Sequence, residues 1–155
     1  MPLPLITVDD IRRIAQEIFD DLGMGYIENN YQNALLLELR KLDRSCRTEV
    51  EIPVLYKGCH IGWARADIVT SEYIIELKAL DTWKTAKVEN QIRKYMRHLF
   101  EGDGIVRTGI MINFNQDPRH SVGVDVQVVI QNRPTIANME EDGEGGGGAA
   151  CIESE

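Results

Sequence analysis

The sequence predicts an α+β domain in which a mixed sheet of about five strands is flanked by helices. The chain has 155 residues, of which 43% are hydrophobic, so it is large enough to bury the core of one domain. Its apolar residues recur first at helical spacing, then at the alternating spacing of strands, and then at helical and strand spacing again. The chain contains no internal repeat.

Two helices are predicted before the first strand. The first begins after Thr7, a capping residue followed by Asp9 and Asp10, and ends at Gly23. Its apolar face consists of Ile11, Ile14, Ala15, Ile18, Phe19 and Leu22. The apolar face of the second helix consists of Ile27, Tyr31, Ala34, Leu35, Leu39 and Leu42. The second helix has a basic end at Arg40, Lys41, Arg44 and Arg47.

Three strands follow these helices. The first, residues 49–56, alternates, and a turn at Lys57-Gly58 ends it. Its apolar face is formed by Val50, Ile52, Val54 and Tyr56. The other two strands are residues 60–69 and 73–80. One face of the middle strand carries only small residues, Gly62, Ala64 and Ala66. Small side chains allow close packing, so we expect helices to cover the side of the sheet away from its charges.

The hairpin between the second and third strands has a predictable register. A turn centred on Ser71-Glu72 pairs Thr70 with Tyr73, and a four-residue loop would keep the same register. Asp67 then lies directly opposite Glu76. Like charges opposed across two strands destabilise a sheet, so we expect a compensating partner at this point.

A third helix and two strands complete the predicted domain. The helix covers residues 87–100 and has a buried face formed by Val88, Ile92, Tyr95, Met96 and Leu99. The last two strands are residues 106–115 and 122–131.

The negative charge of the chain is concentrated at its C-terminal end. The formal net charge is −8, but residues 138–155 hold six of the 25 acidic residues and no Lys or Arg, which leaves 19 acidic and 17 basic residues elsewhere. Sequence rich in Gly and Glu buries too little apolar surface to offset the entropy of ordering. We therefore predict a folded domain at residues 1–137 and a flexible acidic tail at residues 138–155.

The cysteines and the N-terminus suggest an intracellular protein. Cys46, Cys59 and Cys151 lack the spacing of a zinc or iron–sulfur site, and their odd number predicts free thiols in a reducing compartment. The N-terminus does not resemble a signal peptide, and no apolar run approaches membrane-spanning length. We expect a soluble protein of the cytoplasm or nucleus that has no membrane partner. The sequence does not indicate an oligomeric state.

Charged residues interrupt the third strand, which is otherwise apolar. Glu76 and Lys78 point to the same face about 7 Å apart, because side chains alternate along a strand. Two carboxylates brought together, here Asp67 and Glu76, either share a proton or bind a cation, and Mg²⁺ accepts one or two carboxylates together with water and phosphate oxygens. Lys78 could then hold a water molecule or a phosphate oxygen. The alternative is an ion pair of Glu76 with Lys78 on an edge strand, with Arg65 serving Asp67.

This arrangement resembles the PD-(D/E)XK nuclease superfamily. The stretch "RAD" supplies Asp67 and "ELK" supplies Glu76 and Lys78, while the proline of the motif is absent. "GYIENNY", residues 25–31, is similar to the signature of the GxxExxY proteins, and "QIRKY", residues 91–95, fits the QxxxY element of the RecB-like branch. The resemblance covers roughly residues 8–131 and implies a restriction-endonuclease-like fold, with an Asp on one strand and E-x-K on the next.

The resemblance also implies roles for individual residues. Asp67 and Glu76 would bind Mg²⁺ or Mn²⁺ with the carbonyl oxygen of Leu77, and Lys78 would orient or activate the attacking water. Glu28 would complete the acidic cluster, although a Glu in the first turn of a helix is also favoured by the helix dipole.

Gln91 and Tyr95, four residues apart, lie on one face of the third helix. The resemblance implies that they position the substrate, whereas Tyr95 taken alone reads as a core aromatic residue.

The resemblance implies hydrolysis of phosphodiester bonds in nucleic acid, and we expect DNA. Basic residues of the third helix could contact its backbone, although charge on a helix usually forms a solvated face. These residues are Lys84, Lys87, Arg93, Lys94 and Arg97. The alternative is a module that keeps the nuclease fold with weak or no catalysis and binds nucleic acid or a protein partner.

Overall fold

The computed structural model of the chain describes residues 5–101 and 108–130, which form three helices and five strands. The helices are α1 (Val8–Leu22), α2 (Glu28–Leu42) and α3 (Thr85–Glu101). The strands are β1 (Arg47–Tyr56), β2 (Cys59–Val69), β3 (Tyr73–Lys78), β4 (Thr108–Phe114) and β5 (Val124–Ile130). The predicted tail and its boundary at residue 137 lie outside the described residues.

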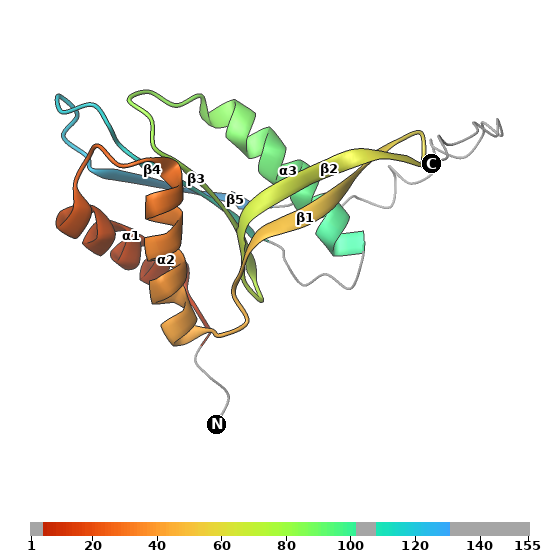
Figure 1. Cartoon of the computed structure of the whole chain (residues 1–155), viewed down its shortest axis with the longest axis horizontal. Helices are drawn as coiled ribbons and strands as arrows, with labels where there is room; N and C mark the ends of the chain where they lie inside the picture. The colour runs from red at the N-terminus through yellow and green to blue at the C-terminus, as the bar shows by residue number, and fades with distance from the viewer. Residues whose placement is uncertain (1–4, 102–107, 131–155) are drawn as a thin grey trace.

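The strands form one mixed sheet in the order β1-β2-β3-β4-β5 (Figure 1). β3 and β4 are parallel and are connected through α3, while the other neighbouring pairs are antiparallel. A parallel pair requires a long crossover connection, which α3 provides. The predicted α+β class, with about five strands and flanking helices, is confirmed.

The two N-terminal helices begin and end close to where the sequence predicts. The Oγ1 atom of Thr7 accepts a hydrogen bond from the backbone N–H of Asp10 at 3.1 Å, and Asp10 accepts one from the backbone N–H of Thr7 at 2.9 Å. Gly23 ends α1 with a φ of 68°, a conformation that glycine adopts without strain. Ile27 caps α2 and is 68% exposed, so its predicted place on the buried face is wrong.

Helices cover both faces of the sheet (Figure 1). α1 and α2 pack on one face, against buried side chains that include Ile68 and Leu77. α3 packs on the other face, where its residues Ile92 and Met96 contact a cluster that includes Ile74. Since Glu76 and Ile74 alternate onto the same face of β3, α3 covers the face that carries the charges.

This arrangement corrects one expectation about the sheet. The small residues of β2 were expected on the side of the sheet away from the charges, yet Ala64 and Ala66 belong to the cluster that α3 covers. Ala66 and Ile68 both follow the alternation of one strand, but they contact different cores. The alternation of side chains along β2 is therefore interrupted near Asp67, which lies between these two residues.

The hairpin of β1 and β2 extends away from α1 and α2, alongside α3 (Figure 1). Its turn at Lys57-Gly58 has φ values of 50° and 79°, the conformation that two-residue hairpin turns favour. Of the predicted apolar face, only Ile52 is buried, while Val54 and Tyr56 are 38% and 60% exposed. The apolar face of this strand is therefore exposed at the tip of the hairpin in the described part of the structure.

The cysteines depart from the expectation of three free thiols. Cys46 is free and buried. Cys59 is disulfide-bonded, so the free-thiol prediction is wrong at this position. Cys151 lies outside the described residues. In the described part of the chain, no helix is both long and apolar enough to cross a membrane.

Close packing of α3 on β4 provides a stability prediction. Gly109 lies beneath the fully buried Ile92, and a Cβ atom at Gly109 would overlap the Cγ2 atom of Ile92. Gly109→Ala should lower the free energy of unfolding by about 1 to 3 kcal/mol through overpacking. Gly62→Ala is the matched control, because its added Cβ meets no atom within 4 Å. Urea unfolding of both variants checks this; equal midpoints would contradict the described contact.

Candidate active site

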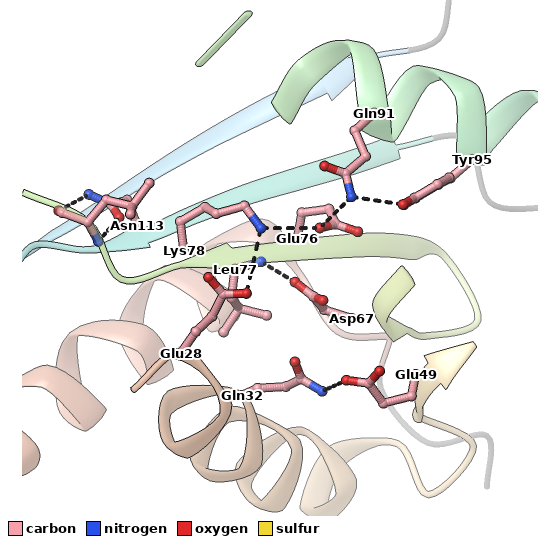
Figure 2. A network of polar contacts seen from close by, with 11 residues as sticks. Glu28, Gln32, Glu49, Asp67, Glu76, Leu77, Lys78, Gln91, Tyr95 and Asn113 are labelled. Atoms are coloured by element: carbon pink, nitrogen blue, oxygen red, sulfur yellow. Dashed lines mark hydrogen bonds and ion pairs between the residues drawn. The ribbon is translucent and has the colours of Figure 1, made fainter. Parts of the chain in front are cut away.

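β2 and β3 separate at the position of the two acidic residues (Figure 2). Ile68 pairs with Ile75, and the N–H of Thr70 donates to the carbonyl of Tyr73 at 2.9 Å, so the predicted hairpin register is confirmed. The ladder ends before Asp67 and Glu76. There the Oδ2 atom of Asp67 accepts the backbone N–H of Leu77 at 2.8 Å, so a side chain satisfies this strand amide.

Glu76 is a buried carboxylate that lacks full pairing. Its side chain is only 1% exposed, and its Oε2 atom lies 3.4 Å from Nε2 of Gln91 and 3.8 Å from Nζ of Lys78. Its Oε1 atom is buried and has no hydrogen-bond partner among the described residues. Burial, and then the negative charge of Asp67, raise the pKa of Glu76 to about 9. An unpaired buried carboxylate is costly, so this oxygen needs either a proton or a cation.

Asp67 has a similar environment. Burial raises the pKa of this carboxyl above its usual value, against the opposing effects of the Leu77 N–H and the Lys78 ammonium. Two carboxylates in a partly buried site disfavour each other's ionisation, and a bound cation would favour it.

Lys78 connects two elements of the site (Figure 2). Its Nζ atom lies 3.6 Å from Oε1 of Glu28, in the first turn of α2, and 3.8 Å from Oε2 of Glu76 on its own strand. Burial raises the pKa of Glu28, while the charge of Lys78 lowers it. The side chain of Lys78 is 22% exposed, so its ammonium group lies at the border between the acidic residues and solvent.

The two α3 residues predicted from the QxxxY pattern lie at the same site. Nε2 of Gln91 donates to Oη of Tyr95 at 2.8 Å and lies 3.4 Å from Glu76. Tyr95 is also part of the apolar cluster beneath α3, so it packs in the core and presents its hydroxyl to Gln91. Burial raises the pKa of the Tyr95 phenol, against the Gln91 hydrogen bond.

Glu49 is an acidic residue near the site that the sequence did not indicate. The pairs Thr48–Ile68 and Val50–Ala66 place Glu49 across from Asp67, and the Glu49 charge raises the pKa of Asp67. Its φ of 51° is unusual for a residue other than glycine.

Two side chains hold Glu49. Its Oε1 atom accepts a hydrogen bond from Nε2 of the buried Gln32 at 2.9 Å, and its Oε2 atom forms an ion pair with Nη1 of Arg65 at 3.1 Å. Arg65 therefore pairs with Glu49. The alternative interpretation, in which Arg65 pairs with Asp67, is wrong on this point.

The basic residues of the α3 region separate into two groups. Lys87, Lys94 and Arg97 line a groove beside the site. Arg93 instead bonds Glu89 through two nitrogens and donates to the carbonyl of Ile130. Lys84 is exposed and lies outside the groove.

The candidate site offers a divalent cation two carboxylates rather than a larger cluster of ligands. Within residues 5–101 and 108–130, no group of three or more His, Cys, Asp or Glu side chains is arranged to hold a metal ion. Asp67 and Glu76 supply hard oxygen donors, and Oε1 of Glu76 has no other partner in this region. One or two carboxylates match the preference of Mg²⁺, which keeps several waters and takes phosphate oxygens.

A comparison with models of protein families gives a match that covers most of the chain. The family model described as the PD-(D/E)XK nuclease superfamily matches residues 6–124, which include all three helices and the acidic strands. The comparisons with curated proteins and with solved structures found no match. The matched region carries Asp67 on β2, and Glu76 and Lys78 on β3, at the point where the strands separate. The chain therefore belongs to the PD-(D/E)XK nuclease superfamily.

Proposed function

We propose that the protein is a nuclease that uses Mg²⁺ or Mn²⁺ to hydrolyse phosphodiester bonds, with DNA as its substrate. One observation carries this proposal. A buried carboxylate, Glu76, has an oxygen without a hydrogen-bond partner among the described residues and lies beside the second carboxylate, Asp67. The E-x-K spacing and the superfamily membership support the same chemistry. The match of residues 25–31 to the GxxExxY signature leads us to propose that branch of the superfamily.

Asp67 and Glu76 would hold the cation, and the carbonyl oxygen of Leu77 between Glu76 and Lys78 is a further donor. A bound cation lowers the pKa of a water molecule and offsets the negative charge that develops on the phosphate. The N–H of Leu77 keeps one oxygen of Asp67 in place, and Gln91 does the same for Oε2 of Glu76. The other oxygen of each acid is thereby oriented before substrate binds.

Lys78 would act on the reacting groups directly. Its ammonium group is held between Glu28 and Glu76 and is partly exposed. From this position it can donate to the attacking water or to a non-bridging phosphate oxygen, and so stabilise negative charge in the transition state. Glu28 contacts Lys78 and would position it, and the network of Gln91 and Tyr95 would orient the substrate backbone beside Glu76.

A cleavage assay tests the proposed function. Single- and double-stranded DNA and RNA are incubated with the protein in Mn²⁺ or in EDTA, and Asp67→Asn serves as the isosteric variant. We expect cleavage of DNA in Mn²⁺ only, and a loss of about 100-fold or more in the variant, because a neutral amide no longer offsets the charge of the cation. Tight binding without cleavage would instead support a catalytically inactive module that binds nucleic acid. Cleavage that persists in EDTA would contradict the proposal.

A further inference from the structure

A groove of about 930 Å³ runs between α3 and the β1/β2 hairpin. Its hairpin wall is apolar and consists of Ile52, Pro53, Val54, Leu55 and Ala64. Its other wall is the face of α3 that carries Gln91 and Tyr95. Since Gln91 lies 3.4 Å from Oε2 of Glu76, the groove leads to the acidic pair.

The helical wall is basic. Lys87, Lys94, Arg97 and His98 line it, and no Asp or Glu is among the lining residues in the described part of the chain. Lys87 and His98 are separated by eleven residues, or about 16 Å along a helix. In a chain of net charge −8, three Lys and Arg side chains with no carboxylate among the described lining residues make this groove locally positive, which favours anions.

The two unlike walls fit a single strand better than a duplex. A single strand presents phosphates along one side and apolar base faces along the other, and proteins bind it with a basic groove and apolar or aromatic contacts. A duplex presents phosphates on its whole outer surface and hides its base faces. Its phosphates would therefore lie against the apolar wall, where Val54 and Leu55 offer no hydrogen-bonding side chain.

We propose that this groove binds a single strand of DNA and leads it to the acidic pair, with phosphates along α3 and bases along the hairpin. This inference rests on the proposed function and names the form of its substrate. The inference distinguishes among the basic residues of the α3 region. Lys87, Lys94 and Arg97 contact the DNA strand, whereas Arg93 pairs with Glu89 and donates to the carbonyl of Ile130.

Binding in EDTA tests the groove without requiring catalysis. Fluorescence anisotropy measures the affinity for a short labelled single strand, and for its duplex, at several salt concentrations. One variant combines Lys87→Ala, Lys94→Ala and Arg97→Ala. The matched control combines Arg12→Ala, Arg13→Ala and Lys41→Ala, which removes three exposed positive charges from α1 and α2. Circular dichroism confirms that both variants fold.

We expect the wild-type protein to bind the single strand more tightly than the duplex. The groove variant should bind more weakly, and the slope of log K against log salt should fall in magnitude by about 2, since each phosphate contact to a single strand contributes about 0.7. The control should keep the wild-type slope. No binding by the wild type, equal or tighter duplex binding, an unchanged slope in the groove variant, or an equal loss in the control would each overturn the inference.

The outcomes separate this inference from the proposed nuclease activity. Groove-dependent binding of the single strand, with no cleavage in Mn²⁺, would refute the nuclease activity and keep the groove. Cleavage in Mn²⁺ by a groove variant that also binds like the wild type would refute the groove and keep the activity.

Discussion

Glu76→Gln should make the cation-free protein more stable at neutral pH, although it removes a proposed ligand of the cation. The pKa of Glu76 is raised by burial and by Asp67 from 4.5 to about 9. The folded protein therefore holds the proton more tightly than the unfolded chain does. The stability that this proton contributes is fully present below pH 4.5 and is lost as the pH rises through 9.

Glutamine carries no ionisable group, so Glu76→Gln removes this loss. The free energy of unfolding of the variant, relative to that of the wild type, should increase by about 1.4 kcal/mol per pH unit between these two pKa values. At neutral pH this increase should reach on the order of 3 kcal/mol. Urea unfolding in EDTA across this pH range measures it. Glu17→Gln, at an exposed position of α1, serves as the control. A variant that is less stable than wild type throughout the range would show that Glu76 is already well paired.

Lys78→Met should lower the rate of DNA cleavage by about 100- to 1,000-fold, the usual effect of removing one donor that stabilises transition-state charge. Methionine keeps most of the side-chain volume, so packing should survive while the ion pairs with Glu28 and Glu76 are lost. The measurement is the single-turnover rate at saturating DNA, which separates the chemical step from binding.

Lys41→Met is the matched control, because Lys41 is an exposed lysine that pairs only with Glu38 on the same helix in the described structure. A folded Lys78→Met protein that cleaves DNA at the wild-type rate would exclude Lys78 from the reaction. Glu28→Gln should have a smaller effect than Lys78→Met, since Glu28 contacts Lys78 and acts by positioning it.

Local signals in the sequence predicted the fold and the hairpin register that brings Asp67 and Glu76 together. The capping box at Thr7, the Lys57-Gly58 turn and the Ser71-Glu72 turn each depend on residues close in the chain. Because register follows from turn position, Asp67 and Glu76 could be placed next to each other from the sequence. Gln91 and Tyr95 share a helix face at a spacing of four residues, and the structure places both at the site.

Glu49 was missed because its position depends on an irregularity that no local pattern reveals. A regular hairpin from the Lys57-Gly58 turn would place Ala66 opposite Glu49. The register shifts by one residue between Val54 and Leu55, so Glu49 lies across from Asp67 instead. A shift of one residue moves every side chain beyond it to a different partner.

The end of the β2/β3 ladder also depends on a tertiary interaction. Asp67 replaces a backbone acceptor for Leu77 where the ladder of β2 and β3 ends, and Gln91 of α3 approaches Glu76 at the same place. Sequence alternation describes strands in a regular sheet, so it could not predict where the sheet opens.

The central claim is that Asp67 and Glu76 form one site for a divalent cation. Calorimetric titration of Mn²⁺ into the protein at neutral pH, in buffers of different ionisation enthalpy, tests it most directly. We expect one binding site in the wild type and at least tenfold weaker binding by Glu76→Gln. We also expect the wild type to release a proton on binding, because the Glu76 pKa of about 9 keeps that carboxyl protonated without a cation. Equal affinity in the two proteins, with no proton released, would contradict the claim.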